Sequence, residues 1–92
     1  MKYEVLQTRR FARQYKKLRD NVAASVDSAV EAVASKPSIG ERKKGDLALL
    51  VVYKFKAHTQ TWLLGYTVDD AIRLVYLEAV GPHENFYREL KQ

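Results

Sequence analysis

A histidine and a tyrosine near the carboxyl end of the chain have the spacing of side chains that work together. His83 and Tyr87 are four positions apart, directly after Gly81–Pro82. If a helix begins here, both project from one face of it. Imidazole transfers protons near neutral pH, and a tyrosine beside it could stack on a base or hydrogen-bond a phosphate. The structural alternative is a solvent-exposed histidine and a tyrosine that closes a core with Phe86 and Leu90.

Two lysines form the second candidate site. In an extended segment over residues 50–56, alternate residues share a face, so Leu50 and Val52 lie on the same side as Lys54 and Lys56. A face that changes from apolar to doubly positive suits the floor of a groove at the rim of a sheet, where cations could stabilise a phosphate. The structural alternative is that both lysines protect an edge strand against aggregation.

Positive charge is concentrated in the first part of the chain. The net charge is +5; residues 1–56 hold 13 of the 16 Lys and Arg but 6 of the 11 Asp and Glu, and residues 57–92 carry a net −2. This asymmetry indicates a surface that faces a polyanion or an acidic protein. A solubilising helix face is the alternative for the first basic cluster, at residues 9–19. The further basic residues that could contact a polyanion are Arg42, Lys43, Lys44 and Arg73.

Other kinds of site lack the residues that they need. The sequence has no cysteine, which excludes disulfides, thiolate metal ligands and cysteine nucleophiles. It has no glycine-rich phosphate loop, and its two histidines are far apart, so we expect no metal and no cofactor. The longest apolar run, residues 47–53, is too short to span a bilayer, and the amino terminus has no signal-peptide core. We therefore expect a cytoplasmic protein without a membrane partner.

The elements that must position these residues follow from periodicity and from turn signals. A length of 92 residues suits one domain, residues 1–92. The patterns predict a strand at 2–7, helices from the N-cap Thr8 to about 19 and from 20 or 21 to 35, strands at 47–56, 61–68 and 72–80, and a short helix at 83–91. Turns are expected at 57–60 and 69–70. This order, β-α-α-β-β-β with a short C-terminal helix, is typical of an α+β domain with a helical hairpin packed on an antiparallel-rich sheet.

Taken together, these features resemble the RelE/ParE superfamily of toxins from type II toxin–antitoxin systems. The likeness covers essentially the whole chain and rests on the element order, the Tyr-Lys-Phe-Lys strand at 53–56 and the Val-Gly-x-His junction at 80–83. The stretch 54–83 can be laid on a RelE-like ribonuclease toxin without a gap. In such relatives two lysines contact mRNA and assist catalysis, and a Gly-x-His with a later aromatic residue takes part in cleavage; the resemblance assigns these roles to Lys54, Lys56, His83 and Tyr87.

One position departs from the family pattern. Ribonuclease relatives usually have a phosphate-binding arginine in the next strand, where this chain has Leu63. The departure leaves room for the ParE-like branch, whose members poison DNA gyrase, and for a non-catalytic relative that only binds nucleic acid or protein. His83 together with Lys54 and Lys56 favours the ribonuclease, because a gyrase poison needs no acid–base pair. The missing charge could come from Lys43, Lys44 or Arg73.

The resemblance also implies a mechanism and partners. A ribonuclease without a metal must activate the ribose 2′-hydroxyl, stabilise charge on the phosphate and protonate the departing 5′-oxygen. Lys54 would accept the 2′ proton, His83 would protonate the 5′-oxygen, and Tyr87 would orient the nucleotide. The products would be a 2′,3′-cyclic phosphate and a 5′-hydroxyl. We expect cleavage of mRNA on the ribosome, no small-molecule cofactor, and inhibition by a cognate acidic antitoxin.

Overall fold

The computed structural model describes residues 2–43 and 49–90. Its elements follow the chain in this order: β1 (Glu4–Gln7), α1 (Arg9–Lys16), α2 (Asp20–Ser35), a short 3₁₀ helix η1 (Pro37–Ile39), β2 (Glu41–Arg42), β3 (Val51–Ala57), β4 (Gln60–Asp69), β5 (Leu74–Pro82) and α3 (His83–Leu90). None of the helices in the described ranges combines the length and the apolar character that a membrane crossing requires.

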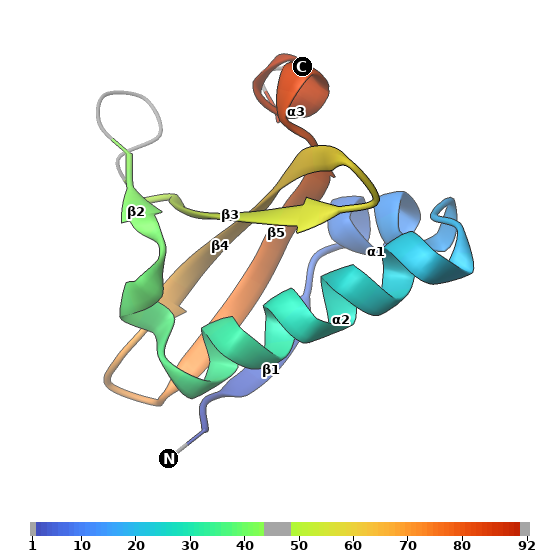
Figure 1. The fold of residues 1–92 in the computed structure, drawn as a ribbon. Helices are drawn as coiled ribbons and strands as arrows, with labels where there is room; N and C mark the ends of the chain where they lie inside the picture. The colour runs from blue at the N-terminus through green and yellow to red at the C-terminus, as the bar shows by residue number, and fades with distance from the viewer. Residues whose placement is uncertain (1, 44–48, 91–92) are drawn as a thin grey trace.

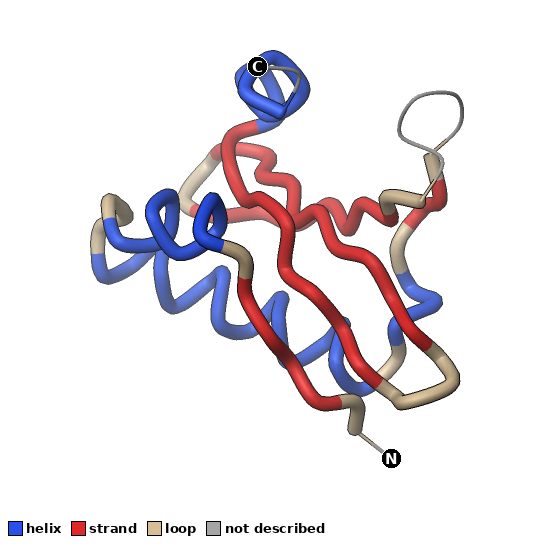
Figure 2. The backbone as a smooth tube through the Cα atoms, turned by 180° about the vertical axis from the view of Figure 1, so that it is seen from behind, coloured by secondary structure: helices blue, strands red, loops and turns tan. Residues whose placement is uncertain are grey.

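The strands form one mixed sheet in the order β1-β5-β4-β3-β2. β1 runs parallel to β5, and the other neighbouring pairs are antiparallel. α1 and α2 cover one face of this sheet, and α3 stands at the end of β5 (Figure 1). The view from behind shows the strands in front of α2 (Figure 2). The predicted α+β class, with a helical hairpin on an antiparallel-rich sheet, is confirmed.

The larger core lies between the sheet and the two long helices. α2 buries residues at helical spacing, and β4 contributes Trp62, Leu64 and Tyr66 from alternate positions. Thr8 has the predicted N-cap role in α1: its hydroxyl accepts a hydrogen bond from the Phe11 backbone N–H at 3.2 Å and donates one to the Leu77 carbonyl at 3.0 Å. This cap therefore fixes α1 to β5 as well as starting the helix.

A smaller core lies on the opposite face, under α3. Its buried members are Leu50, Val52, Leu63, Ala79 and Phe86. Phe86 reaches the sheet at Gly65, where a β-carbon would come within 2.7 Å of the Phe86 ring. Any side chain at this position would push α3 outward, so the absence of one lets the helix sit close to the strands.

Several predicted boundaries differ from the structure; α1, for example, ends at Lys16 instead of about residue 19. A short strand at Glu41–Arg42 was not predicted, because two residues give no readable alternation. The second predicted strand, 47–56, is observed only from Val51; Leu49 precedes it in a turn and is exposed, and residues 44–48 lie outside the described part of the chain.

The turn between β4 and β5 is longer than the two residues predicted. Residues 70–73 form it, so the last strand begins at Leu74 instead of 72. The Asp69 side chain accepts a hydrogen bond from the Ala71 backbone N–H at 3.1 Å, and Arg73 has a positive φ of 53°. A side-chain bond to the backbone two residues on stabilises such a turn without glycine.

Candidate functional site

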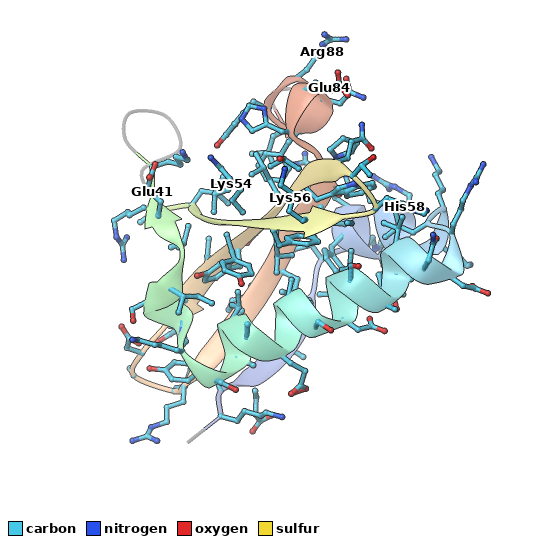
Figure 3. All side chains as sticks on the ribbon, viewed as in Figure 1. Glu41, Lys54, Lys56, His58, Glu84 and Arg88 are labelled. Atoms are coloured by element: carbon cyan, nitrogen blue, oxygen red, sulfur yellow. The ribbon has the colours of Figure 1, made fainter. Side chains whose placement is uncertain are left out.

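The floor of the candidate site is a row of residues across three strands on the α3 face. Lys54 of β3 pairs with Leu63 of β4, which pairs with Gly81 of β5. Leu63 is 2% exposed and Lys54 is exposed, so the row changes from apolar to charged toward β2. Lys54 and Lys56 rise from β3 on the side of α3, away from α2 (Figure 3). This is the face that strand alternation predicts for both lysines.

α3 forms one wall of the site. His83 is its first residue and is exposed, whereas Tyr87, one turn later, is half-buried. Phe86 anchors the helix in the smaller core, and the Tyr87 ring meets the Phe86 ring edge-on at 5.1 Å between centroids. His83 and Tyr87 both line a hollow of about 260 Å³ with Lys54. The predicted i, i+4 arrangement therefore brings imidazole, phenol and ammonium groups to one cavity.

β2 forms the facing wall of this hollow. Glu41 and Lys43 line it, and their side chains form an ion pair with 3.0 Å between Nζ and the carboxylate. The Lys43 ammonium also lies 5.6 Å from the centroid of the Tyr87 ring. Hydrogen bonds to the Tyr87 hydroxyl and then to Glu41 raise the pKa of Lys43 above its usual value. The hydrogen bond from Lys43 lowers the pKa of Glu41, so its carboxylate is ionised at neutral pH.

A buried tyrosine fixes the backbone that leads into β2. The Tyr66 hydroxyl donates a hydrogen bond to the Pro37 carbonyl at 2.6 Å and accepts one from the Gly40 N–H at 3.1 Å. A β-carbon at Gly40 would lie 2.5 Å from that hydroxyl, so the close approach requires glycine. Burial raises the pKa of Tyr66, which keeps the phenol in its hydrogen-bonding neutral form. The larger core thus holds the start of β2, from which Glu41 enters the site.

A second hollow adjoins the first. It has a volume of about 360 Å³ and is lined by Lys54, Gln60, Thr61, His83 and Glu84. The Gln60 side-chain amide donates a hydrogen bond to the Glu84 carboxylate at 3.1 Å, which links the start of β4 to the first turn of α3. Lys54 and His83 line both hollows, so they stand at the boundary between two compartments of one groove.

The structure gathers some of the predicted site residues and separates others. Lys43, Lys54, His83 and Tyr87 line the groove. Lys56 shares the face of Lys54 but borders neither hollow. Arg42 lines a different hollow, with Val51 and Asp70. Arg73 lies at the opposite end of β5, where its carbonyl accepts a hydrogen bond from the start of β1. Lys44 lies outside the described residues.

Sequence reasoning missed Glu41 in the first hollow and Gln60, Thr61 and Glu84 in the second. Glu41 is the clearest case. It is exposed and acidic, and it stands between an isoleucine–glycine pair and three basic residues, so no pattern marks it. Only the folding of residues 41–42 against β3, which places Glu41 opposite Val52, brings its carboxylate to the groove. Within the described residues, no three His, Cys, Asp or Glu side chains gather as metal ligands would.

The groove has the set of groups that proton transfer at a phosphate needs: a carboxylate, an imidazole and two ammonium groups around one hollow. A family model described as the ParE-like toxin of type II bacterial toxin–antitoxin systems matches residues 5–91. The chain belongs to this family. The match spans all the described strands and helices except the first residue of β1, and it agrees with the RelE/ParE superfamily resemblance of the sequence.

Solved structures similar to this ParE-like toxin are toxins of the same superfamily. The RelBE2 toxin–antitoxin complex from Mycobacterium tuberculosis matches with a TM-score of 0.75 and 25% identity over 90% of this chain and 100% of that chain. Mutant E. coli RelE in complex with an antitoxin RelBc peptide matches with a TM-score of 0.70 and 25% identity over 98% and 95% of the two chains. Among curated proteins, no sequence matches the chain.

Proposed function

We propose that this ParE-like toxin is a metal-independent mRNA endoribonuclease that acts on ribosome-bound mRNA and inhibits translation. The observation that carries the proposal is the meeting of Lys54, His83, Tyr87, Lys43 and Glu41 around one hollow. A hollow lined by cations suits a phosphodiester, and the acidic and imidazole groups beside it suit the two proton transfers of transesterification. The likeness to RelE supports the same reading.

The cations have separate roles in this proposal. Lys54 stands at the boundary of the two hollows, where the scissile phosphate would lie, and stabilises the charge that develops on it. Lys43 carries a raised pKa and remains a cation, so it provides charge and holds Glu41 and the Tyr87 hydroxyl in place. Its position in the groove offers the positive charge that Leu63 does not supply. Lys56, Arg42 and Arg73 line neither hollow and then contribute to contacts outside the groove.

Two groups can accept the proton of the 2′-hydroxyl. Chemical reasoning from the sequence assigns this role to Lys54, but Glu41 lines the same hollow and its carboxyl group is ionised at neutral pH. A carboxylate accepts a proton without first losing one, as a lysine ammonium must, so Glu41 can take this role; the hydrogen bond from Lys43, which lowers the pKa of Glu41, makes it a weaker base than a free glutamate. His83 then protonates the departing 5′-oxygen, and the products are a 2′,3′-cyclic phosphate and a 5′-hydroxyl. Tyr87 presents its ring for stacking on the base.

The partner in this proposal is a cognate acidic antitoxin. Two similar structures are toxins bound to antitoxin chains or peptides, which supports such a partner here. The basic first half of the chain offers charge complementarity to it. Co-expression with the antitoxin should suppress toxicity and yield a stable complex. A chain that accumulates harmlessly in cells without any partner contradicts the toxin proposal.

One observation favours a second candidate, a ParE-like poison of DNA gyrase. Leu63 is buried in the smaller core under α3, so the site lacks the strand arginine of ribonuclease relatives. Expression in cells separates the two candidates. Loss of translation with mRNA cleavage supports the ribonuclease, whereas a block in DNA replication with gyrase-linked DNA breaks supports the poison.

His83→Gln tests the ribonuclease directly. Glutamine keeps much of the size and hydrogen-bonding capacity of histidine but cannot titrate, and general acid catalysis contributes roughly 10²–10⁴-fold in rate. We expect mRNA cleavage to fall by at least about a hundredfold, while ribosome and antitoxin binding persist. Primer extension on a reporter mRNA from expressing cells measures the cleavage. Undiminished cleavage removes His83 from the mechanism.

A further inference from the structure

The groove is divided into two compartments that, among the described residues, have two lining residues in common. Lys54 and His83 line both hollows; Glu41, Lys43 and Tyr87 line only the first, and Gln60, Thr61 and Glu84 line only the second. A phosphate held at Lys54 and His83 has one nucleotide on each side. Each hollow is therefore placed to receive one of the two nucleotides that flank the cleaved bond.

We propose that the second hollow is the subsite for the base on the 3′ side of the cleaved bond, and that Gln60 and Glu84 make it prefer bases with an exocyclic amino group over uracil. This inference rests on the proposed ribonuclease function and adds a substrate preference to it. The second hollow is more open than the first, so a base would lie against its polar lining instead of being enclosed by it.

The direction of the strand follows from the proton transfers. The nucleotide that provides the attacking 2′-oxygen must lie beside the proton acceptor, and Glu41 lines only the first hollow. That hollow also has the Tyr87 ring for stacking. The 5′-oxygen that departs belongs to the other nucleotide, and His83, which protonates it, borders the second hollow. The 3′ nucleotide therefore enters the second hollow.

The preference follows from the polar groups in the second hollow. A carboxylate repels a phosphate, so Glu84 suits a base edge better than the RNA backbone. The Gln60 amide donates to one Glu84 oxygen at 3.1 Å, which leaves the other oxygen and the Gln60 carbonyl as acceptors. Cytosine, adenine and guanine offer an amino group to such acceptors. Uracil has no amino group: its single donor on the same edge, N3–H, is flanked by two carbonyl oxygens, which the acceptors repel.

Glu84→Gln and Gln60→Ala test the subsite on ribosomes that carry a set of mRNAs differing only at the nucleotide 3′ of the mapped cut. For the wild type we expect slower cleavage before uracil than before the other bases. Glu84→Gln should reduce that discrimination roughly tenfold, because a base-edge hydrogen-bond pair contributes about 1–3 kcal/mol. Gln60→Ala, at the exposed start of β4, should reduce it in the same direction. Preference at the nucleotide 5′ of the cut should not change.

Asn85→Ala is the matched control, because Asn85 is the next residue of α3, is exposed and lines neither hollow. Circular dichroism and antitoxin binding establish that each variant is folded. Equal cleavage before all four bases by the wild type, or an unchanged preference in both variants, overturns this inference and leaves the ribonuclease proposal standing. A wild type that cuts no mRNA overturns both. A preference that changes on the 5′ side reverses the assignment of the two hollows.

Discussion

The two faces of the sheet differ in how they use the same strands. The face under α1 and α2 buries a large apolar cluster in which Val26, Val33 and Leu64 have no exposed surface. The face under α3 has a cluster of five buried residues and then opens into the charged groove. β3 shows the change within one strand, because Val51 and Ala57 are buried on the first face while Lys54 is exposed on the second.

The residues that stabilise the fold therefore lie mainly on one face of the sheet, and the residues of the candidate site lie on the other. Apolar burial on the first face contributes most of the folding free energy, since that energy scales with the apolar area removed from water. The groove face can then hold exposed charges that add little to stability. The separation is incomplete at one place, where Tyr66 reaches from the large core to hold the backbone of Pro37 and Gly40 before β2. Variants on each side should therefore affect different measurements.

The largest expected effect on stability is that of Leu64→Ala. Leu64 is fully buried in the large core and pairs with Tyr53 and Val80 across the sheet. Removing its side chain should lower the free energy of unfolding by about 2–5 kcal/mol, as measured by urea unfolding. Cleavage per folded molecule should remain near that of the wild type. A large loss of cleavage in the folded fraction contradicts the separation of the two faces.

Of the two strand lysines, Lys54 should contribute more to the rate of cleavage. Lys54 borders both hollows and Lys56 borders neither. Losing a group that stabilises transition-state charge costs roughly 10²–10³-fold in kcat, so we expect about that loss for Lys54→Ala and a much smaller one for Lys56→Ala. The double variant should lose toxicity but keep its fold and antitoxin binding. If the double variant unfolds, the two lysines instead have a structural role in protecting an edge strand.

Tyr66→Phe tests the one link between the faces. It leaves the Pro37 carbonyl and the Gly40 N–H without their partner, which costs roughly 1–3 kcal/mol for a buried group. Because β2 then loses its anchor, kcat per folded molecule should also fall, while KM for the ribosome changes less. Thermal unfolding and single-turnover cleavage measure the two effects. A stability loss with unchanged kcat assigns Tyr66 to the core alone.

Lys43→Met should shift the pH dependence of cleavage, in addition to the loss of rate that follows from removing its positive charge. The hydrogen bond from Lys43 holds the pKa of Glu41 below its usual value of 4.5. Without it the pKa of Glu41 rises, so a larger fraction is protonated at a given acidic pH. If Glu41 accepts the 2′ proton, the acidic limb of kcat/KM should move to higher pH. An unmoved limb indicates that another group, such as Lys54, is the proton acceptor.

The sequence predicted the features that depend on local patterns. Periods of two and of about 3.6 residues identified the two long helices and the α3 segment, and Thr8 was correctly predicted as an N-cap. Alternation in β3 placed Lys54 and Lys56 on one face. The four-residue spacing of His83 and Tyr87 predicted that both side chains would meet in one place, and they line the same hollow.

Contacts between distant segments were decided only by the tertiary structure. Residues 41–42 are too few to show periodicity, yet their pairing with β3 brings Glu41 into the groove and turns Arg42 to another hollow. The pairing of Lys54 with Leu63 and of Leu63 with Gly81 determined which cation meets His83. Arg73 has a charge suitable for RNA, but the direction of β5 carries it to the far end of the sheet. Charge and spacing are local properties of the chain, whereas the neighbours of each group depend on strand register and on which elements cover each face.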